Sequence, residues 1–221
     1  MFSNEPAITR SSESALATNK VIRNTYTLLS MTLLFSAVMA AVSMFLNIGH
    51  GASLACSIGA IALIWLVLPR TANSGAGILT VFGITGLLGF GLGPLLNYYL
   101  ALQGGSEIVA TALGGTGVIF LALSGYALTT RKDFSFLGGF LFVGFFVVLG
   151  AMLLSFFVDI PGLQLAISSA VILIMSGFIL FDTSRIINGG ETNYVMATVG
   201  LYLSIYNIFV HLLAILGASN D

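Results

Sequence analysis

Two ionisable side chains, Asp182 and His211, lie deep inside long apolar runs of this sequence. A charge in such a run is costly, so an ionisable group there is a candidate functional residue. Asp182 precedes Asn188 by six positions, which places it ~9 Å from the end of a helix. Arg185 follows three residues later on the same helical face. Two roles for Asp182 stay open: a structural anchor bonded to Arg185 or to hydroxyls, and a gating or proton-sensing group.

A polar stripe accompanies His211 in the last apolar run. Ser204, Asn207 and His211 are spaced i, i+3 and i+7, so they share one face of a helix, and Gly200 adds a small residue beside them. A neutral histidine with one hydrogen bond and a histidine that titrates near pH ~6 to 7 both fit this position. The stripe must face the interior of a bundle, which predicts a central position for this helix.

Asp182 and Ser204 lie at equal distances along the chain from Asn193, near the short Gly189–Gly190 turn. A short turn makes the two helices antiparallel neighbours, so these side chains are expected at similar depth and facing each other. The candidate gate or pH-sensing residues are therefore Asp182, Ser204, Arg185, Asn207 and His211.

Patterns typical of enzymes and cofactor sites are absent from the sequence. Ser124-Gly125 and Ser176-Gly177 lack the preceding glycine of serine-hydrolase motifs. No metal-ligand cluster or nucleotide loop occurs, and the single cysteine, Cys56, lies in an apolar run as a core residue would. We expect no catalytic activity and no cofactor, and the net charge of −1 predicts no nucleic-acid partner.

The composition indicates an all-α, polytopic membrane protein. Hydrophobic residues make up 57% of the chain and charged residues only 7%, against about 25% in soluble domains. A span of the hydrocarbon core needs about 20 apolar residues. Seven runs qualify: Tyr26–Leu46, Ala52–Leu68, Ala76–Leu96, Ile108–Leu128, Phe134–Val158, Leu163–Asn188 and Val195–Leu216.

The charges predict the orientation, because Lys and Arg mark the cytoplasmic side. With seven spans, every basic residue falls on one face: Arg10, Lys20, Arg23, Arg70, Arg131, Lys132 and Arg185. The opposite loops carry only Glu107 and Asp159, and Asp159 before Pro161 suits the start of the sixth span. We therefore expect a flexible cytoplasmic tail (residues 1–24), a seven-helix domain (residues 25–217) and a short periplasmic tail (residues 218–221).

Glycines indicate close helix packing in the third span. Small residues let helices in lipid approach closely, and Gly200 in the seventh span is of the same kind. Pro94 lacks an N–H group and should kink or end the third span. The glycines of that span include Gly83, Gly86, Gly89, Gly91 and Gly93.

Several segments, in order and spacing, resemble the Bax inhibitor-1 family, also called the transmembrane Bax inhibitor motif family. The resemblance covers nearly the whole chain beyond the tail. Its carriers are Gly91-Leu92-Gly93-Pro94, Arg131-Lys132-Asp133-Phe134-Ser135-Phe136-Leu137-Gly138-Gly139, Phe181-Asp182-Thr183-Ser184, Gly189-Gly190-Glu191-Thr192-Asn193-Tyr194 and Leu201-Tyr202-Leu203-Ser204 with Asn207.

The resemblance implies a central seventh helix within two three-helix layers. It is strongest to a bacterial branch of inner-membrane proteins that modulate the membrane-bound ATP-dependent protease FtsH. This branch implies membrane lipid and FtsH, with or without its membrane-associated regulators, as partners. The tail of ~24 residues could reach ~80 Å if extended, far enough to engage such a protease.

Some family members act instead as pH-sensitive calcium leaks, in which two aspartates share a proton and latch the pore. Asp182 matches the first aspartate, but Ser204 occupies the second position and cannot ionise. A two-carboxylate latch cannot form here, although Asp182 could still bond Ser204 at an inner gate. A calcium or proton leak is therefore the alternative to protease modulation.

Overall fold

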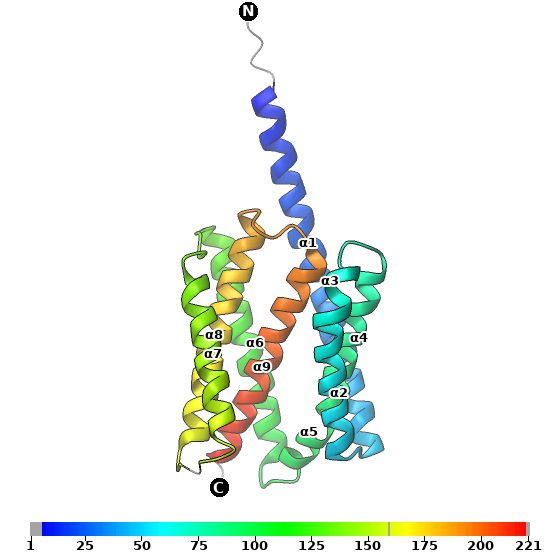
Figure 1. Cartoon of the computed structure of the whole chain (residues 1–221), viewed down its shortest axis with the longest axis vertical. Helices are drawn as coiled ribbons and strands as arrows, with labels where there is room; N and C mark the ends of the chain where they lie inside the picture. Colours follow the sequence, from blue (N-terminus) through cyan, green and yellow to red (C-terminus); the bar gives the residue numbers. More distant parts are fainter. Residues whose placement is uncertain (1–5, 159, 220–221) are drawn as a thin grey trace, which may run out of the picture.

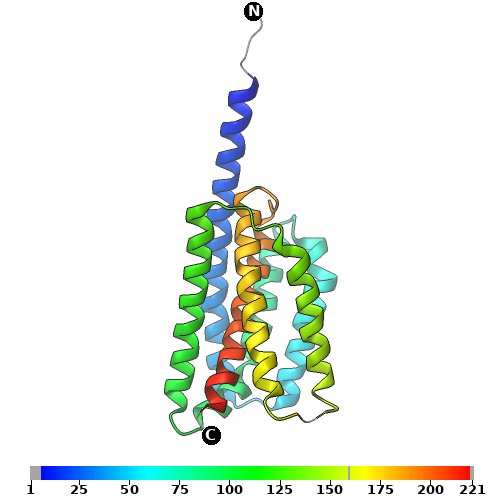
Figure 2. The same ribbon diagram turned by 90° about the vertical axis from the view of Figure 1, so that its left-hand side faces the viewer.

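The computed structural model describes residues 6–158 and 160–219, and over these ranges it consists of helices and their connections (Figures 1 and 2). In chain order the helices are α1 (Pro6–Leu46), α2 (His50–Ala62), a π-helical segment η1 (Leu63–Val67), α3 (Leu68–Thr71), α4 (Ala76–Gly91), α5 (Gly93–Leu100), α6 (Gly105–Thr130), α7 (Leu137–Leu154), α8 (Leu163–Ile187) and α9 (Tyr194–Ala218).

Seven stretches of the described chain are long and apolar enough to cross a membrane, which confirms the all-α fold with seven spans. The second span joins α2, η1 and α3. Its π-helical segment lies just before Pro69, whose missing N–H group disturbs the regular hydrogen-bond ladder. The third span joins α4 and α5.

The spans form two layers with α9 between them (Figure 1). One layer contains α1, α2 and α4, and the other contains α6, α7 and α8. The last helix packs against α1, α4, α6 and α8, and side chains such as Tyr202, Ile208 and Leu213 on it are buried. The central position predicted for the seventh span is therefore confirmed.

Glycines bring α4 against α1. A Cβ added at Gly86 would lie 2.8 Å from the Phe35 ring, and one at Gly89 would collide with the backbone oxygen of Ser36. At Gly93 the added Cβ would collide with Ser43. The spacing i, i+3 and i+7 thus builds one continuous small face in the third span.

The third span breaks at Leu92, between α4 and α5. Pro94 lies in the first turn of α5, where a missing N–H group is tolerated. Gly91 ends α4, and its carbonyl oxygen accepts a hydrogen bond of 2.5 Å from Ser53 Oγ on α2. The break therefore has a bonded partner in the neighbouring span.

The N-terminal segment differs from the expected flexible tail. Residues 6–24 continue α1 as a helix, which projects beyond the bundle (Figures 1 and 2). Val21 and Ile22 already pack against the core, so residues 6–20 form the projecting part. Asp159 and Asp221 lie outside the described residues.

Candidate functional site

Asp182 lies on α8, five residues before the helix ends, and packs against the backbone of α9. A Cβ added at Gly200 would lie only 2.9 Å from Asp182 Oδ2. The carboxylate thus occupies space that the missing side chain of Gly200 leaves free. Among the residues that the structure describes, the Asp182 carboxylate has no hydrogen-bond partner.

Arg185 turns toward the loop after α8, although it shares the helical face of Asp182. Its Nη2 atom lies 3.6 Å from Glu191 Oε2 and donates a hydrogen bond of 3.2 Å to the carbonyl oxygen of Gly190. The guanidinium also lies over the ring of Phe181, 5.5 Å from its centroid. The structure therefore pairs Arg185 with Glu191, and its charge acts on Asp182 only at longer range.

The polar stripe of α9 makes separate local contacts. Ser204 is buried and donates to the carbonyl oxygen of Gly200 at 3.2 Å, so it bonds its own helix and not Asp182. Asn207 likewise donates to Leu203 O at 2.8 Å. His211 reaches another helix, because its Nδ1 atom lies 3.1 Å from the Oγ atom of Ser168 on α8.

A cluster of hydroxyl groups joins four helices next to Asp182. The hydroxyl of Tyr26 on α1 bonds Ser124 Oγ on α6 and lies 3.4 Å from Thr183 Oγ1 on α8. Thr198 on α9 donates to the carbonyl oxygen of Thr25 at 3.3 Å. Sequence reasoning missed this cluster, because isolated hydroxyls on four distant helices carry no spacing signal.

Ser184 fastens the loop between α6 and α7 to α8. It donates to the carbonyl oxygen of Lys132 at 3.1 Å and accepts from the backbone N–H of Phe134 at 2.8 Å. Gly138 packs on Phe181, since a Cβ added there would lie 2.9 Å from the ring. Two of the segments that carry the family resemblance therefore meet at this end of the bundle.

Asn193 fastens the turn between α8 and α9. Its Oδ1 atom caps α9 by accepting from the N–H groups of Val195 and Met196 at 2.9 and 3.2 Å. Its Nδ2 group donates to Ala72 O at 3.0 Å and to Asn73 Oδ1 at 2.8 Å, across to the loop before α4. The turn between α8 and α9 is thus hydrogen-bonded to the loop before α4.

Asp133 is the acidic residue of the loop between α6 and α7. Its Oδ1 atom accepts a hydrogen bond of 2.8 Å from the backbone N–H of Ser135. Hydrogen bonds from the side chain and backbone of Ser135 lower the pKa of this exposed carboxyl from its ordinary value. Asp133 therefore stays ionised throughout the neutral range.

The arrangement places polar and charged side chains together at this end of the bundle. The described residues bring no three His, Cys, Asp or Glu side chains together as metal ligands would be. What the geometry provides is one half-buried carboxylate that has no hydrogen-bond partner among the described residues. It lies near the end of α8, where Ser184 bonds the loop between α6 and α7. A carboxylate in such a site can keep α8 and α9 in one arrangement or respond to pH by binding a proton.

Comparison with known proteins gives a consistent result. The family described as "Inhibitor of apoptosis-promoting Bax1" matches residues 18–221. A protein of Escherichia coli K12 named "Modulator of FtsH protease YccA" is 53% identical over 94% of each chain, and one from E. coli O6:H1 named "Inner membrane protein YccA" matches equally. An "Uncharacterized membrane protein" of Vibrio cholerae is 49% identical over 99% of each chain.

Proposed function

The chain belongs to the Bax1 inhibitor family, and on that premise we propose that it is a non-catalytic regulator of the bacterial inner membrane. It binds the membrane-bound ATP-dependent protease FtsH and restrains it. The name of the E. coli relative, "Modulator of FtsH protease YccA", supports this choice of partner.

The projecting part of α1 is the observation that carries the proposal. Residues 6–20 extend the first span beyond the bundle by ~22 Å, at 1.5 Å per residue. Leu16, Asn19 and Lys20 on this extension are exposed. A helix of this kind is a handle that a membrane-bound protease can hold beside the bilayer.

The orientation places the handle on the side where an ATP-dependent protease works. Basic residues gather at the end of the bundle from which the extension projects. They include Arg70 in α3, Arg131 and Lys132 after α6, and Arg185 at the end of α8. By the positive-inside rule this end is cytoplasmic, with the C-terminus in the periplasm.

The bundle itself resists extraction, which lets the protein occupy the protease without rapid degradation. Pulling on α1 must first break its close contact with α4 at Gly86, Gly89 and Gly93. It must also separate α1 from the hydroxyl cluster around Tyr26. Slow unfolding under force prolongs the time for which the protease is engaged.

Co-purification from membranes tests this proposal. The full chain should retain FtsH, whereas a variant lacking residues 2–15 should lose at least most of it, because the span from Leu16 remains while most of the handle is gone. A variant with residues 2–15 scrambled controls for length alone. Equal recovery of FtsH with all three proteins would show that the handle is not the contact.

The unpaired Asp182 carboxylate favours an ion leak as a second candidate. In vesicles containing the purified protein, calcium or proton flux should then vary with pH, and Asp182→Asn should remove that variation. Asp133→Asn is the matched control, because Asp133 is exposed in a loop. Flux no greater than in empty vesicles, or flux that is flat from pH 5 to 8, would eliminate a pH-sensitive leak.

A further inference from the structure

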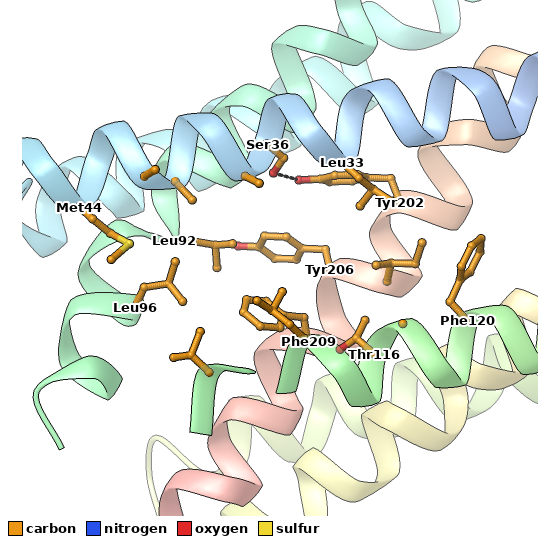
Figure 3. A pocket seen from close by; sticks show the side chains of 17 residues that line it. Leu33, Ser36, Met44, Leu92, Leu96, Thr116, Phe120, Tyr202, Tyr206 and Phe209 are labelled. Carbon is orange, nitrogen blue, oxygen red and sulfur yellow. Dashed lines mark hydrogen bonds between the residues drawn. The ribbon is translucent and has the colours of Figure 1, made fainter. Parts of the chain in front are cut away.

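An apolar cavity of about 430 Å³ lies between α1 and α6 (Figure 3). Leu33 and Met44 mark its ends on α1, and the aromatic rings of Tyr202, Tyr206 and Phe209 on α9 form its back wall. Neither Asp182 nor His211 lines the cavity, so the cavity is distinct from the candidate site.

Three of the four hydroxyl groups of the lining, all but that of Tyr206, bond partners within the protein. Tyr202 and Ser36 bond each other through their hydroxyls at 2.6 Å (Figure 3), and Thr116 Oγ1 donates to Ala112 O at 2.7 Å. What remains toward the cavity is mainly hydrocarbon. A space of this kind stays dry and takes an apolar occupant.

The cavity opens sideways, in the direction of the lipid. Its rim includes Ala37 and Ala41 on α1 and Leu113 on α6, all of which are exposed. The two walls are each packed on α9. Small rim residues on α1 leave an entrance that a slender molecule can pass.

The length of the cavity indicates what kind of molecule it can hold. The lining runs from Leu33 to Met44 on α1 and from Val109 to Phe120 on α6, which is ~16 Å on each helix. One leaflet is about 15 Å of the ~30 Å hydrocarbon core, so the cavity is one leaflet long.

We infer that this cavity binds one acyl chain of a bilayer phospholipid, which enters between α1 and α6. The cavity reaches Met44, Leu96 and Val109, close to where α1 and α5 end and α6 begins. The lipid therefore comes from the leaflet at the end of the bundle opposite the basic residues. Filling the space restores contacts that the lining side chains would otherwise lack.

Two glycines of α6 provide a matched test. A Cβ added at Gly117 or at Gly114 meets nothing within 4 Å, but only Gly117 lines the cavity. The proteins are reconstituted in phosphatidylethanolamine–phosphatidylglycerol vesicles, extracted in mild detergent and examined by native mass spectrometry. The wild type and Gly114→Phe should retain one phospholipid, and Gly117→Phe should lower its occupancy at least tenfold. Equal occupancy in all three, or none in the wild type, would overturn the inference.

A second measurement needs no variant. A phosphatidylethanolamine with a photoactivatable group in its acyl chain should label cavity residues of the wild-type protein, among them Met44 and Phe209. Val118 and Leu121 on α6 are highly exposed and report ordinary contact with surrounding lipid. Labelling confined to such outer residues, or cross-linking of the cavity to a second protein chain, would contradict binding of an acyl chain.

Discussion

Asp182 and Gly200 are two halves of one contact. The carboxylate lies where a side chain on residue 200 would be, so the position of the acid depends on the absence of a Cβ on the facing helix. Glycine in a helix interior is unfavourable by about 0.5–1 kcal/mol relative to alanine. At position 200 this cost has a physical reason, because only glycine leaves room for the Asp182 carboxylate.

Gly200→Ala should therefore destabilise the protein, although alanine is the better helix former. The added methyl group forces the Asp182 carboxylate to move, and overpacking of this kind costs about 1–3 kcal/mol. Thermal unfolding in detergent measures the effect. Gly125→Ala on α6 is the control, because a Cβ there meets nothing within 4 Å. Equal Tm values for both variants would show that the Asp182 carboxylate can move away from an added methyl group without loss of stability.

The pH dependence of the loop between α6 and α7 follows from Asp133. Because its pKa is lowered, the hydrogen bond to Ser135 is present above the ordinary pKa of an aspartate and is lost only as the pH falls below it. Amide hydrogen exchange at Ser135, corrected for its intrinsic pH dependence, should show constant protection from pH 5 to 8. Protection that decreases between pH 7 and 5 would contradict this assignment.

At the scale of helices, spacing along the chain predicted how deep a residue lies in the bundle but not which way its helix is rotated about its axis. Equal distances from Asn193 correctly bring the Asp182 and Ser204 regions of α8 and α9 to the same end of the bundle. The rotation of α9 about its axis decides which residue faces Asp182, and the structure places Gly200 there, one turn from Ser204. Arg185 illustrates the same limit, because a helical face does not show that a long side chain bends toward Glu191.

Glycine spacing in the third span was more informative. Gly86, Gly89 and Gly93 lie on one face by simple helical periodicity, and that face contacts α1. The partner helix could not be deduced from the sequence, because small residues indicate a close approach without identifying what approaches. Ser36 and Ser43 on α1 became recognisable as contacts only in the structure.

Gly89→Ala should push α1 away from α4. The added Cβ would collide with backbone atoms of Ser36, which cannot rotate aside as a side chain can. We expect a loss of at least about 3 kcal/mol or failure to fold, at the upper end for overpacking. Tm and yield from membranes measure it, with Gly139→Ala as the control in open space. A variant as stable as that control would refute tight α1–α4 packing.

At the scale of the molecule, composition was sufficient to predict a membrane fold, because few other folds accommodate so few charges. The lengths of the apolar runs then predicted the number of spans. The N-terminal segment was harder to interpret. Its polarity suggested a flexible tail, yet no glycine or proline interrupts residues 7–46, so nothing ends the helix before Leu46. Polarity indicates solvent exposure, whereas the absence of helix breakers governs continuity.

The orientation can be measured with single cysteines in a Cys56→Ser background. Ser11→Cys should react with a membrane-impermeant maleimide only after the inner membrane is opened, because the basic end is cytoplasmic. Ser219→Cys, beyond the end of α9, should react in intact spheroplasts. The reverse pattern would place the helical extension in the periplasm and away from any cytosolic ATPase.

Restraint of FtsH by the helical extension is most directly measured as a degradation rate. FtsH is reconstituted in vesicles with a membrane-protein substrate, and degradation is followed at rising ratios of the full chain or of the variant lacking residues 2–15. The account predicts that the full chain slows degradation in a saturable way, while it is itself degraded slowly, and that the shortened chain has little effect. Equal slowing by both proteins, or rapid degradation of the full chain without slowing, would contradict it.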